Sequence, residues 1–166
     1  MNKLGLYIHV PFCRKKCNYC DFYSLAGCED RTEGYCAAVK RQMTALSPLC
    51  TSRVCDSIYF GGGTPSILPH DRLCAILRDA KELFALSNDC EITTEANPAT
   101  VSARSLEAYR GCGINRISFG VQTKNPETLR RIGRLHDYGE ALESIALAQS
   151  AGFTNISADL IYGLPG

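Results

Sequence analysis

Three cysteines lie close together near the amino terminus, at Cys13, Cys17 and Cys20. The spacing C-x3-C-x2-C places three thiols on one short loop, and thiolates are the ligands that iron–sulfur clusters select. A cube of four irons normally takes four cysteines, so this loop would leave one iron without a protein ligand. An open coordination position lets a small molecule bind the metal directly, as in catalytic metal sites.

The cysteines also have less specific interpretations. A disulfide framework is typical of small secreted domains and does not suit a chain of 166 residues without a secretion signal. A structural zinc site would need a fourth ligand, which His9, Asp21 or Cys28 could provide, but the usual C-x2-C pairs are missing. The other cysteines share no metal spacing and are predicted to be small, buried or half-buried apolar side chains: Cys28, Cys36, Cys50, Cys55, Cys74, Cys90 and Cys112.

Glycines and an acid follow two apolar runs farther along the chain. Gly61, Gly62 and Gly63 would let the backbone approach a ligand closely, or would form an ordinary tight turn. They do not form a phosphate-binding P-loop, because no Gly-Lys-Ser/Thr follows. Glu95 ends an apolar run, where its carboxylate could accept from a cationic amino group or simply be solvated.

Two further polar residues, Gln122 and Asp159, lie in or at the end of apolar runs in the later part of the chain. Gln122 ends an apolar run, and Asp159 lies within the run 158–161. We expect Asp159 to be buried, and a buried acid needs a partner. Arg116 or Arg134 could supply one in a structural salt bridge.

Strand and helix patterns alternate along the chain, which predicts an α/β fold with a parallel sheet and right-handed crossovers. Ligands bind at the carboxyl ends of parallel strands, where most of these motifs fall. The expected strands are 4–10, 54–60, 90–96, 116–122 and 156–162. The expected helices are about 33–46, 70–84, 102–109, 126–132 and 137–152.

Composition sets broad limits on the protein. With 166 residues, a net charge of +1 and 45% hydrophobic residues, the chain can form one globular core. Near-neutral charge gives no support for nucleic-acid binding. No apolar run approaches the about 18 residues of a membrane span, and no signal peptide is recognisable. Ten cysteines without such a signal predict a reducing, cytoplasmic location.

The motif set resembles the radical S-adenosylmethionine (SAM) superfamily, and within it the oxygen-independent coproporphyrinogen III oxidase family with its relative, the haem chaperone HemW group. The matching segments are 6–20, 59–66, 95–98, 116–122, Arg134 and 159–165. The resemblance implies a partial barrel of six β/α units. Residues 1–166 would be an incomplete radical SAM core, truncated after strand five, with the sixth strand and a C-terminal domain absent and strand five as an exposed edge.

The resemblance also implies cofactors and their ligands. Cys13, Cys17 and Cys20 would hold a [4Fe-4S] cluster, and the amino and carboxylate groups of SAM would bind the open iron. One electron from the reduced cluster then splits the sulfonium into methionine and a 5′-deoxyadenosyl radical. The implied SAM contacts are Tyr7, Tyr19 near the adenine, Gly62, Gly63, Thr64, Glu95 at the amino group, Gln122 and Asp159 at the ribose, and Arg134 at the carboxylate.

One departure separates the two relatives. The oxidase has a further cysteine two residues after the third cluster cysteine, where this chain has Phe22. The resemblance therefore favours a HemW-type haem chaperone, whose haem-binding segment would lie beyond Gly166. The alternatives are the oxidase, which converts propionates of coproporphyrinogen III to vinyl groups, and a non-enzymatic metal-binding module.

The implied partners are SAM, haem or porphyrinogen, and a reduced electron donor of flavodoxin or ferredoxin type. Arg14, Lys15 and Lys16 lie between the first two cysteines. Their charges could offset the cluster or dock an acidic electron carrier, or could simply be a solvated loop face.

Overall fold

The computed structural model describes residues 2–164 and contains a five-stranded parallel sheet. Its strands lie in the order in which they occur along the chain, and every neighbouring pair is parallel. They are β1 (Asn2–Val10), β4 (Arg53–Gly62), β5 (Leu86–Ala96), β6 (Arg116–Gln122) and β7 (Asn155–Leu160). The predicted α/β class and parallel sheet are confirmed. Pro165, the last residue of the 159–165 motif, lies outside the described residues.

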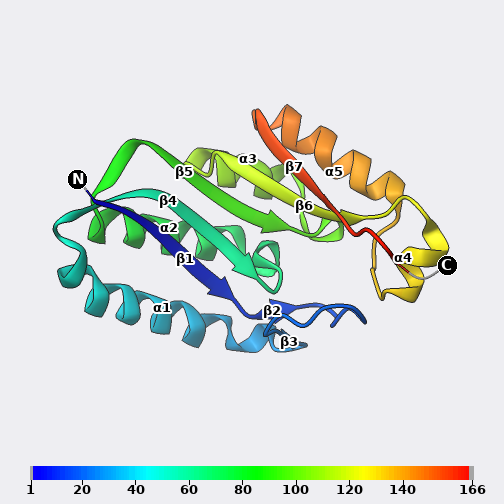
Figure 1. Ribbon diagram of the computed structural model, residues 1–166, viewed down its shortest axis with the longest axis horizontal. Coiled ribbons are helices and arrows are strands. Elements are labelled where there is room, and N and C mark those ends of the chain that lie inside the picture. Colours follow the sequence, from blue (N-terminus) through cyan, green and yellow to red (C-terminus); the bar gives the residue numbers. More distant parts are fainter. Residues whose placement is uncertain (1, 165–166) are drawn as a thin grey trace.

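Helices cover one face of the sheet, and the other face is open (Figure 1). The covering helices are α1 (Thr32–Leu46), α2 (His70–Leu83), α3 (Ala103–Cys112) and α5 (Tyr138–Ser150). Short elements gather at the carboxyl end of the strands: α4 (Pro126–Arg131) and the strand pair β2 (Phe12–Cys13) and β3 (Leu25–Ala26). Single turns of 3-10 helix complete the chain: η1 (Glu29–Arg31), η2 (Ser47–Cys50), η3 (Pro65–Ile67) and η4 (Pro98–Thr100).

Local sequence explains where the helices begin and end. The α3 helix starts at a capping box of Ser102 and Ser105 and ends at Gly113, which has a φ of 104°. Asn125 caps α4 by accepting from two backbone N–H groups. Asp137 and Glu140 form a second capping box at the start of α5. The predicted strand bounds differ from the observed ones mainly because β1, β4 and β5 begin earlier than predicted and β7 ends at Leu160, before the predicted residue 162.

Side chains alternate between the two faces of the sheet. Ile8 and Val10 of β1 are buried against the helices, whereas Tyr7 is 56% exposed on the open face. At the far edge, β7 pairs only with β6 and is largely exposed, and Leu160 is 72% exposed. The predicted exposed edge is thus present among the described strands. No helix within residues 2–164 is both long and apolar enough to cross a membrane.

Candidate functional site

A cavity of about 320 Å³ lies at the carboxyl end of the strands. This volume is within the range of about 300–1,000 Å³ typical of small-molecule sites. Its walls include all three clustered cysteines and every implied SAM contact except Tyr7. Those contacts are Tyr19, Gly62, Gly63, Thr64, Glu95, Gln122, Arg134 and Asp159.

The cysteine loop is fixed by later parts of the chain. The backbone N–H of Asn18 donates to the carbonyl of Ile132 at 2.9 Å, and its side chain donates to the carbonyl of Arg131 at 2.7 Å. Arg14 donates to the carbonyl of Ala99 at 3.1 Å. Two connections that follow β5 and β6 therefore hold a loop that has little regular structure of its own.

The three thiols are half-buried and face polar neighbours. Cys13 Sγ lies 3.6 Å from Thr64 Oγ1, and Arg134 Nη1 lies 3.8 Å from Cys17 Sγ. Within residues 2–164, no group of three or more His, Cys, Asp or Glu side chains is placed to hold a single metal ion. In an iron–sulfur cube each thiolate binds a different iron, so the ligands need not converge on one point.

The glycine loop after β4 packs directly against the entry to the cysteine loop. A Cβ on Gly63 would lie 2.6 Å from the carbonyl oxygen of Phe12, which is backbone and cannot give way. Gly62 has a φ of 110°, and a Cβ there would lie 2.5 Å from the ring of His9. Gly63 N–H donates to Val10 O at 2.8 Å. Glycine is therefore required here by close approach between two loops, which is more than an ordinary turn demands.

Glu95 is oriented by two donors. Tyr59 Oη donates to Oε1 at 2.8 Å, and Gly62 N–H donates to Oε2 at 3.2 Å. Burial raises the pKa of Glu95, although these two hydrogen bonds oppose that rise. A half-buried carboxylate of this kind gains most from a ligand that donates to it.

Gln122 is the only non-glycine residue of the described chain with a positive φ, at 70°. It is 9% exposed, and the register between β6 and β7 shifts beside it. Its carbonyl accepts from Ile161 N–H at 3.0 Å, which helps to hold the conformation. Strained backbone of this kind collects at functional sites. Sequence reasoning identified Gln122 but had no signal for its strain.

Arg134 lies next to both the thiols and the end of β6. Its Nη2 donates to the carbonyl of Gly120, and a Cβ on Gly120 would lie 2.8 Å from that nitrogen. Its Nε is buried without a hydrogen-bond partner among the described residues, as is the side-chain oxygen of Asn97. Both residues line the cavity. Since buried polar atoms are normally paired, each of these two retains unused hydrogen-bonding capacity beside the cavity.

Asn97 was part of a recognised motif but was not predicted as a site residue. Its sequence signal is its position directly after β5 and before Pro98, at the carboxyl end of a strand. Its unpaired oxygen could be found only from the structure.

The prediction that Asp159 is buried was wrong. Asp159 is exposed, because β7 is an edge strand whose open face meets solvent. Its carboxylate accepts from Ser118 Oγ at 3.0 Å. The considered salt bridge was also wrong, because Arg116 lies 3.8 Å from Glu91 and Arg134 donates to a carbonyl and a thiol. Asp159 therefore lines the cavity with no cationic partner in the described chain.

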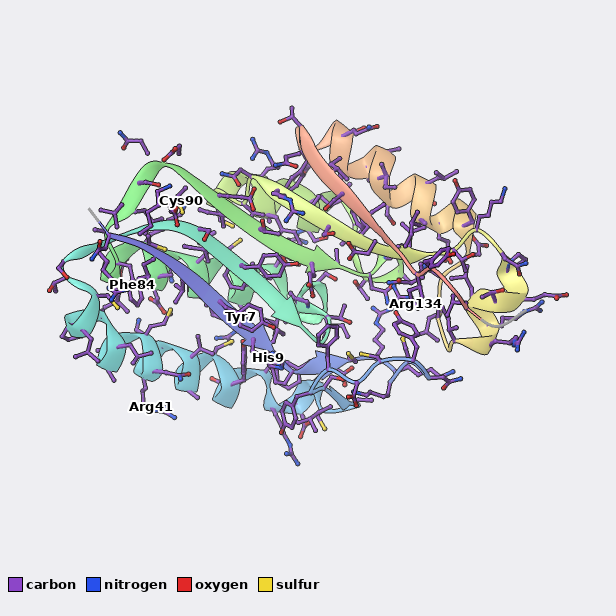
Figure 2. The ribbon with its side chains drawn as sticks, in the orientation of Figure 1. Tyr7, His9, Arg41, Phe84, Cys90 and Arg134 are labelled. Atoms are coloured by element: carbon purple, nitrogen blue, oxygen red, sulfur yellow. The ribbon has the colours of Figure 1, made fainter. Side chains whose placement is uncertain are left out.

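The predicted aromatic contacts divide into two groups. Tyr19 lines the cavity, and burial raises its pKa to about 12. Tyr7 does not line it and stacks on Tyr59 at 6.1 Å between ring centroids. Tyr7 Oη donates to His9 Nδ1 at 3.1 Å, because His9 Nε2 must donate to the carbonyl of Tyr23 at 2.9 Å. His9 is thus fully hydrogen-bonded, and it lies beside Tyr7 on β1, apart from Arg134 (Figure 2).

A family model for the radical SAM superfamily matches residues 7–166. The chain belongs to the radical SAM superfamily. Membership implies a [4Fe-4S] cluster and SAM as cofactors, in agreement with the resemblance drawn from the motifs.

Two curated relatives carry the description "Heme chaperone HemW". The protein of Haemophilus influenzae is 38% identical over 98% of this chain and 44% of its own length. The protein of Escherichia coli is 39% identical over 98% of this chain and 43% of its own length. The chain therefore spans less than half the length of these relatives.

A solved structure supports the fold. Coproporphyrinogen III oxidase (HemN) from Escherichia coli, described as a radical SAM enzyme, superposes with a TM-score of 0.91 and 32% identity. The match covers 99% of this chain and 38% of that one. The predicted partial radical SAM barrel is confirmed for the five strands described.

We expect Glu95 to make stability depend on pH. Because burial raises its pKa in the folded protein, the ionised form is less favourable there than in the unfolded chain. The free energy of unfolding should therefore fall as the pH rises through the interval between the unfolded and folded pKa values. Urea unfolding of the wild type and of Glu95→Gln across about pH 4–8 measures this. Parallel curves for the two proteins would contradict it.

Proposed function

We propose that this chain is the cluster-binding and SAM-binding part of a HemW-type haem chaperone. The observation that carries the proposal is one cavity with thiols on one wall and an unpaired arginine donor beside them. The curated HemW relatives support the assignment to haem handling. The matched part is less than half of each relative, so haem handling enters here as a proposal for this protein.

In the proposed site, Cys13, Cys17 and Cys20 hold the cluster. They fit this role because all three thiols line one cavity and are half-buried. When bound, the cluster supplies the single electron that radical SAM proteins deliver to SAM. The guanidinium of Arg134, 3.8 Å from Cys17 Sγ, lies where it offsets the negative charge of the thiolates.

The remaining wall suits the polar groups of SAM. The N–H groups of Gly62 and Gly63 already donate to Glu95 and to Val10 O, so in this proposal the Glu95 carboxylate would accept from the amino group of SAM. The unpaired Nε of Arg134 suits a carboxylate. In this proposal Gln122 and Asp159, which line the cavity, would bind the ribose hydroxyls, Tyr19 would contact the adenine and Thr64 would lie at the cluster end. Tyr7 would act from outside the cavity, through Tyr59.

Phe22 favours the chaperone over the oxidase. It lines the mouth of the cavity and is 69% exposed, at the position where the oxidase family has its extra cysteine. The oxidase is the second candidate, because the HemN structure superposes over almost the whole chain. An electron donor of flavodoxin or ferredoxin type would meet Arg14, Lys15 and Lys16, which are exposed on the cysteine loop.

Replacing Cys13, Cys17 or Cys20 by Ala should abolish the cluster, because each thiolate would bind its own iron. Iron and acid-labile sulfide, measured after anaerobic reconstitution, test this directly. Cys28→Ala and Cys112→Ala are the matched controls and should retain full cluster content, since neither thiol lines the cavity. A full cluster in Cys17→Ala would remove that residue from the site, and a reconstituted chain without sulfide would refute the cofactor assignment.

Replacing Arg134 by Ala should weaken SAM binding by about 1.5–3 kcal/mol, the range for a hydrogen bond to a charged group. Calorimetric titration of SAM into the reconstituted variant measures the change, with iron content checked because Arg134 also contacts Cys17. Arg130→Ala is the control, because Arg130 is exposed on α4. Equal SAM affinity in Arg134→Ala at equal iron content would exclude the proposed carboxylate contact.

Chaperone and oxidase are separated with the full-length protein. We expect it to bind haem in a spectroscopic titration and to leave coproporphyrinogen III unchanged under reducing, SAM-containing conditions. Chromatography of the porphyrin products checks the second point. Formation of vinyl groups would overturn the chaperone proposal in favour of the oxidase.

A further inference from the structure

A row of polar side chains crosses the open face of the sheet and ends at the cavity. Side chains alternate between the two faces of a strand, so residues two positions apart share a face. The residues of the row are Glu91 and Thr93 on β5, Arg116 and Ser118 on β6, and Ser157 and Asp159 on β7. These three strands are neighbours in the sheet (Figure 1). Ser118 and Asp159 line the cavity, whereas the other four residues do not.

Hydrogen bonds connect Arg116 to Asp159 through two serine hydroxyls. Arg116 Nη2 donates to Ser157 Oγ at 3.0 Å, and Ser157 Oγ donates to Ser118 Oγ at 2.9 Å. Ser118 Oγ in turn donates to Asp159 Oδ1 at 3.0 Å. Each serine has a single hydroxyl proton, so the three bonds run in one direction, from the cation to the carboxylate. Hydrogen bonds arranged in this way polarise one another.

The cationic end of the row is held by β5. Arg116 Nη1 donates to Thr93 Oγ1 at 3.3 Å and lies 3.8 Å from Glu91 Oε1. Thr93 Oγ1 itself donates to Glu91 Oε1 at 3.0 Å. The guanidinium is therefore fixed from the strands on both sides of β6, and it is connected to Asp159 through the two serines.

Asp159 depends on Ser118 for its orientation. The Ser118 bond is the one hydrogen bond that the Asp159 side chain makes within residues 2–164, and this side chain is exposed on an edge strand. Ser118 is 3% exposed, so its hydroxyl has little access to water and needs this acceptor. The bond removes rotational freedom from the carboxylate before a ligand arrives, which lowers the entropy cost of binding.

We propose that Ser118 is a positioning residue, which Ser157 and Arg116 hold in place and which orients the Asp159 carboxylate for the ribose hydroxyls of SAM. The inference rests on the proposed function, in which Asp159 binds the ribose. A carboxylate has about four acceptor positions, so one bond from Ser118 leaves room for two hydroxyl donors. Arg116 and Ser157 do not line the cavity, so they act on the ligand through Ser118.

Calorimetric titration of SAM into the anaerobically reconstituted chain tests the proposal, with iron content matched between variants. Ser118→Ala should weaken SAM binding about two- to tenfold, the equivalent of one hydrogen bond. Ser118→Thr keeps the hydroxyl and should bind nearly as tightly as the wild type. Ser157→Ala should cause a smaller loss, because Ser118 still donates to Asp159. Ser57→Ala is the matched control and should bind normally, since Ser57 is half-buried on β4 and does not line the cavity.

A double-mutant cycle separates positioning from direct contact with the ligand. In the Asp159→Ala background, adding Ser118→Ala should leave the SAM affinity unchanged, because the carboxylate that Ser118 orients is gone. A Ser118 that contacts the ligand, or that only supports the fold, would show the same loss in both backgrounds, and this result would overturn the proposal. Wild-type affinity in Ser118→Ala would also overturn it.

SAM analogues that lack the 2′ or the 3′ hydroxyl test the role of the ribose. The wild type should bind SAM more tightly than these analogues, and Ser118→Ala should reduce that preference. An equal preference in the two proteins would contradict the inference and leave the proposed function intact. A wild-type chain with a full cluster that does not bind SAM would instead refute the proposed function, and this inference with it.

Discussion

The hydrogen bond from Gly63 N–H to Val10 O fixes the distance between the two loops that form the cavity. It joins the ends of β1 and β4, and Thr64 N–H extends it with a bond to Phe12 O at 2.7 Å. No side chain fits between these backbones. Main-chain contacts therefore set the separation of the cysteine loop and the glycine loop, and the N–H of Gly62 holds the Glu95 carboxylate beside them.

The cavity carries a positive group on one side and a carboxylate on the other, which suits a ligand that has both a negative and a positive charge. Arg134 lies beside Cys17 and the end of β6, whereas Glu95 is held by Tyr59 and Gly62 on the side of β4. The two groups do not form an ion pair with each other within the described chain. Keeping opposite charges apart in a half-buried space costs free energy that a zwitterionic ligand would recover.

Much of this architecture follows from sequence pattern, because the alternation of strands and helices specifies a parallel sheet and places motifs at one edge. The cysteine spacing likewise predicted a shared loop. The exposure of Asp159 could not be predicted in this way, since a strand at the edge of a sheet has the same local pattern as a central one. The strain at Gln122 and the unpaired oxygen of Asn97 depend on contacts with distant segments, which no local pattern encodes.

The order of the strands in the sheet has a consequence for biosynthesis. Each strand of the five-stranded sheet pairs with the strand of that sheet that precedes it in the sequence. The sheet can therefore assemble progressively as the ribosome extends the chain. The cysteine loop emerges first, yet the carbonyls that brace it belong to Ala99, Arg131 and Ile132. Translation must therefore proceed past α4 before the nascent polypeptide can hold its three sulfurs in the arrangement seen in the folded chain.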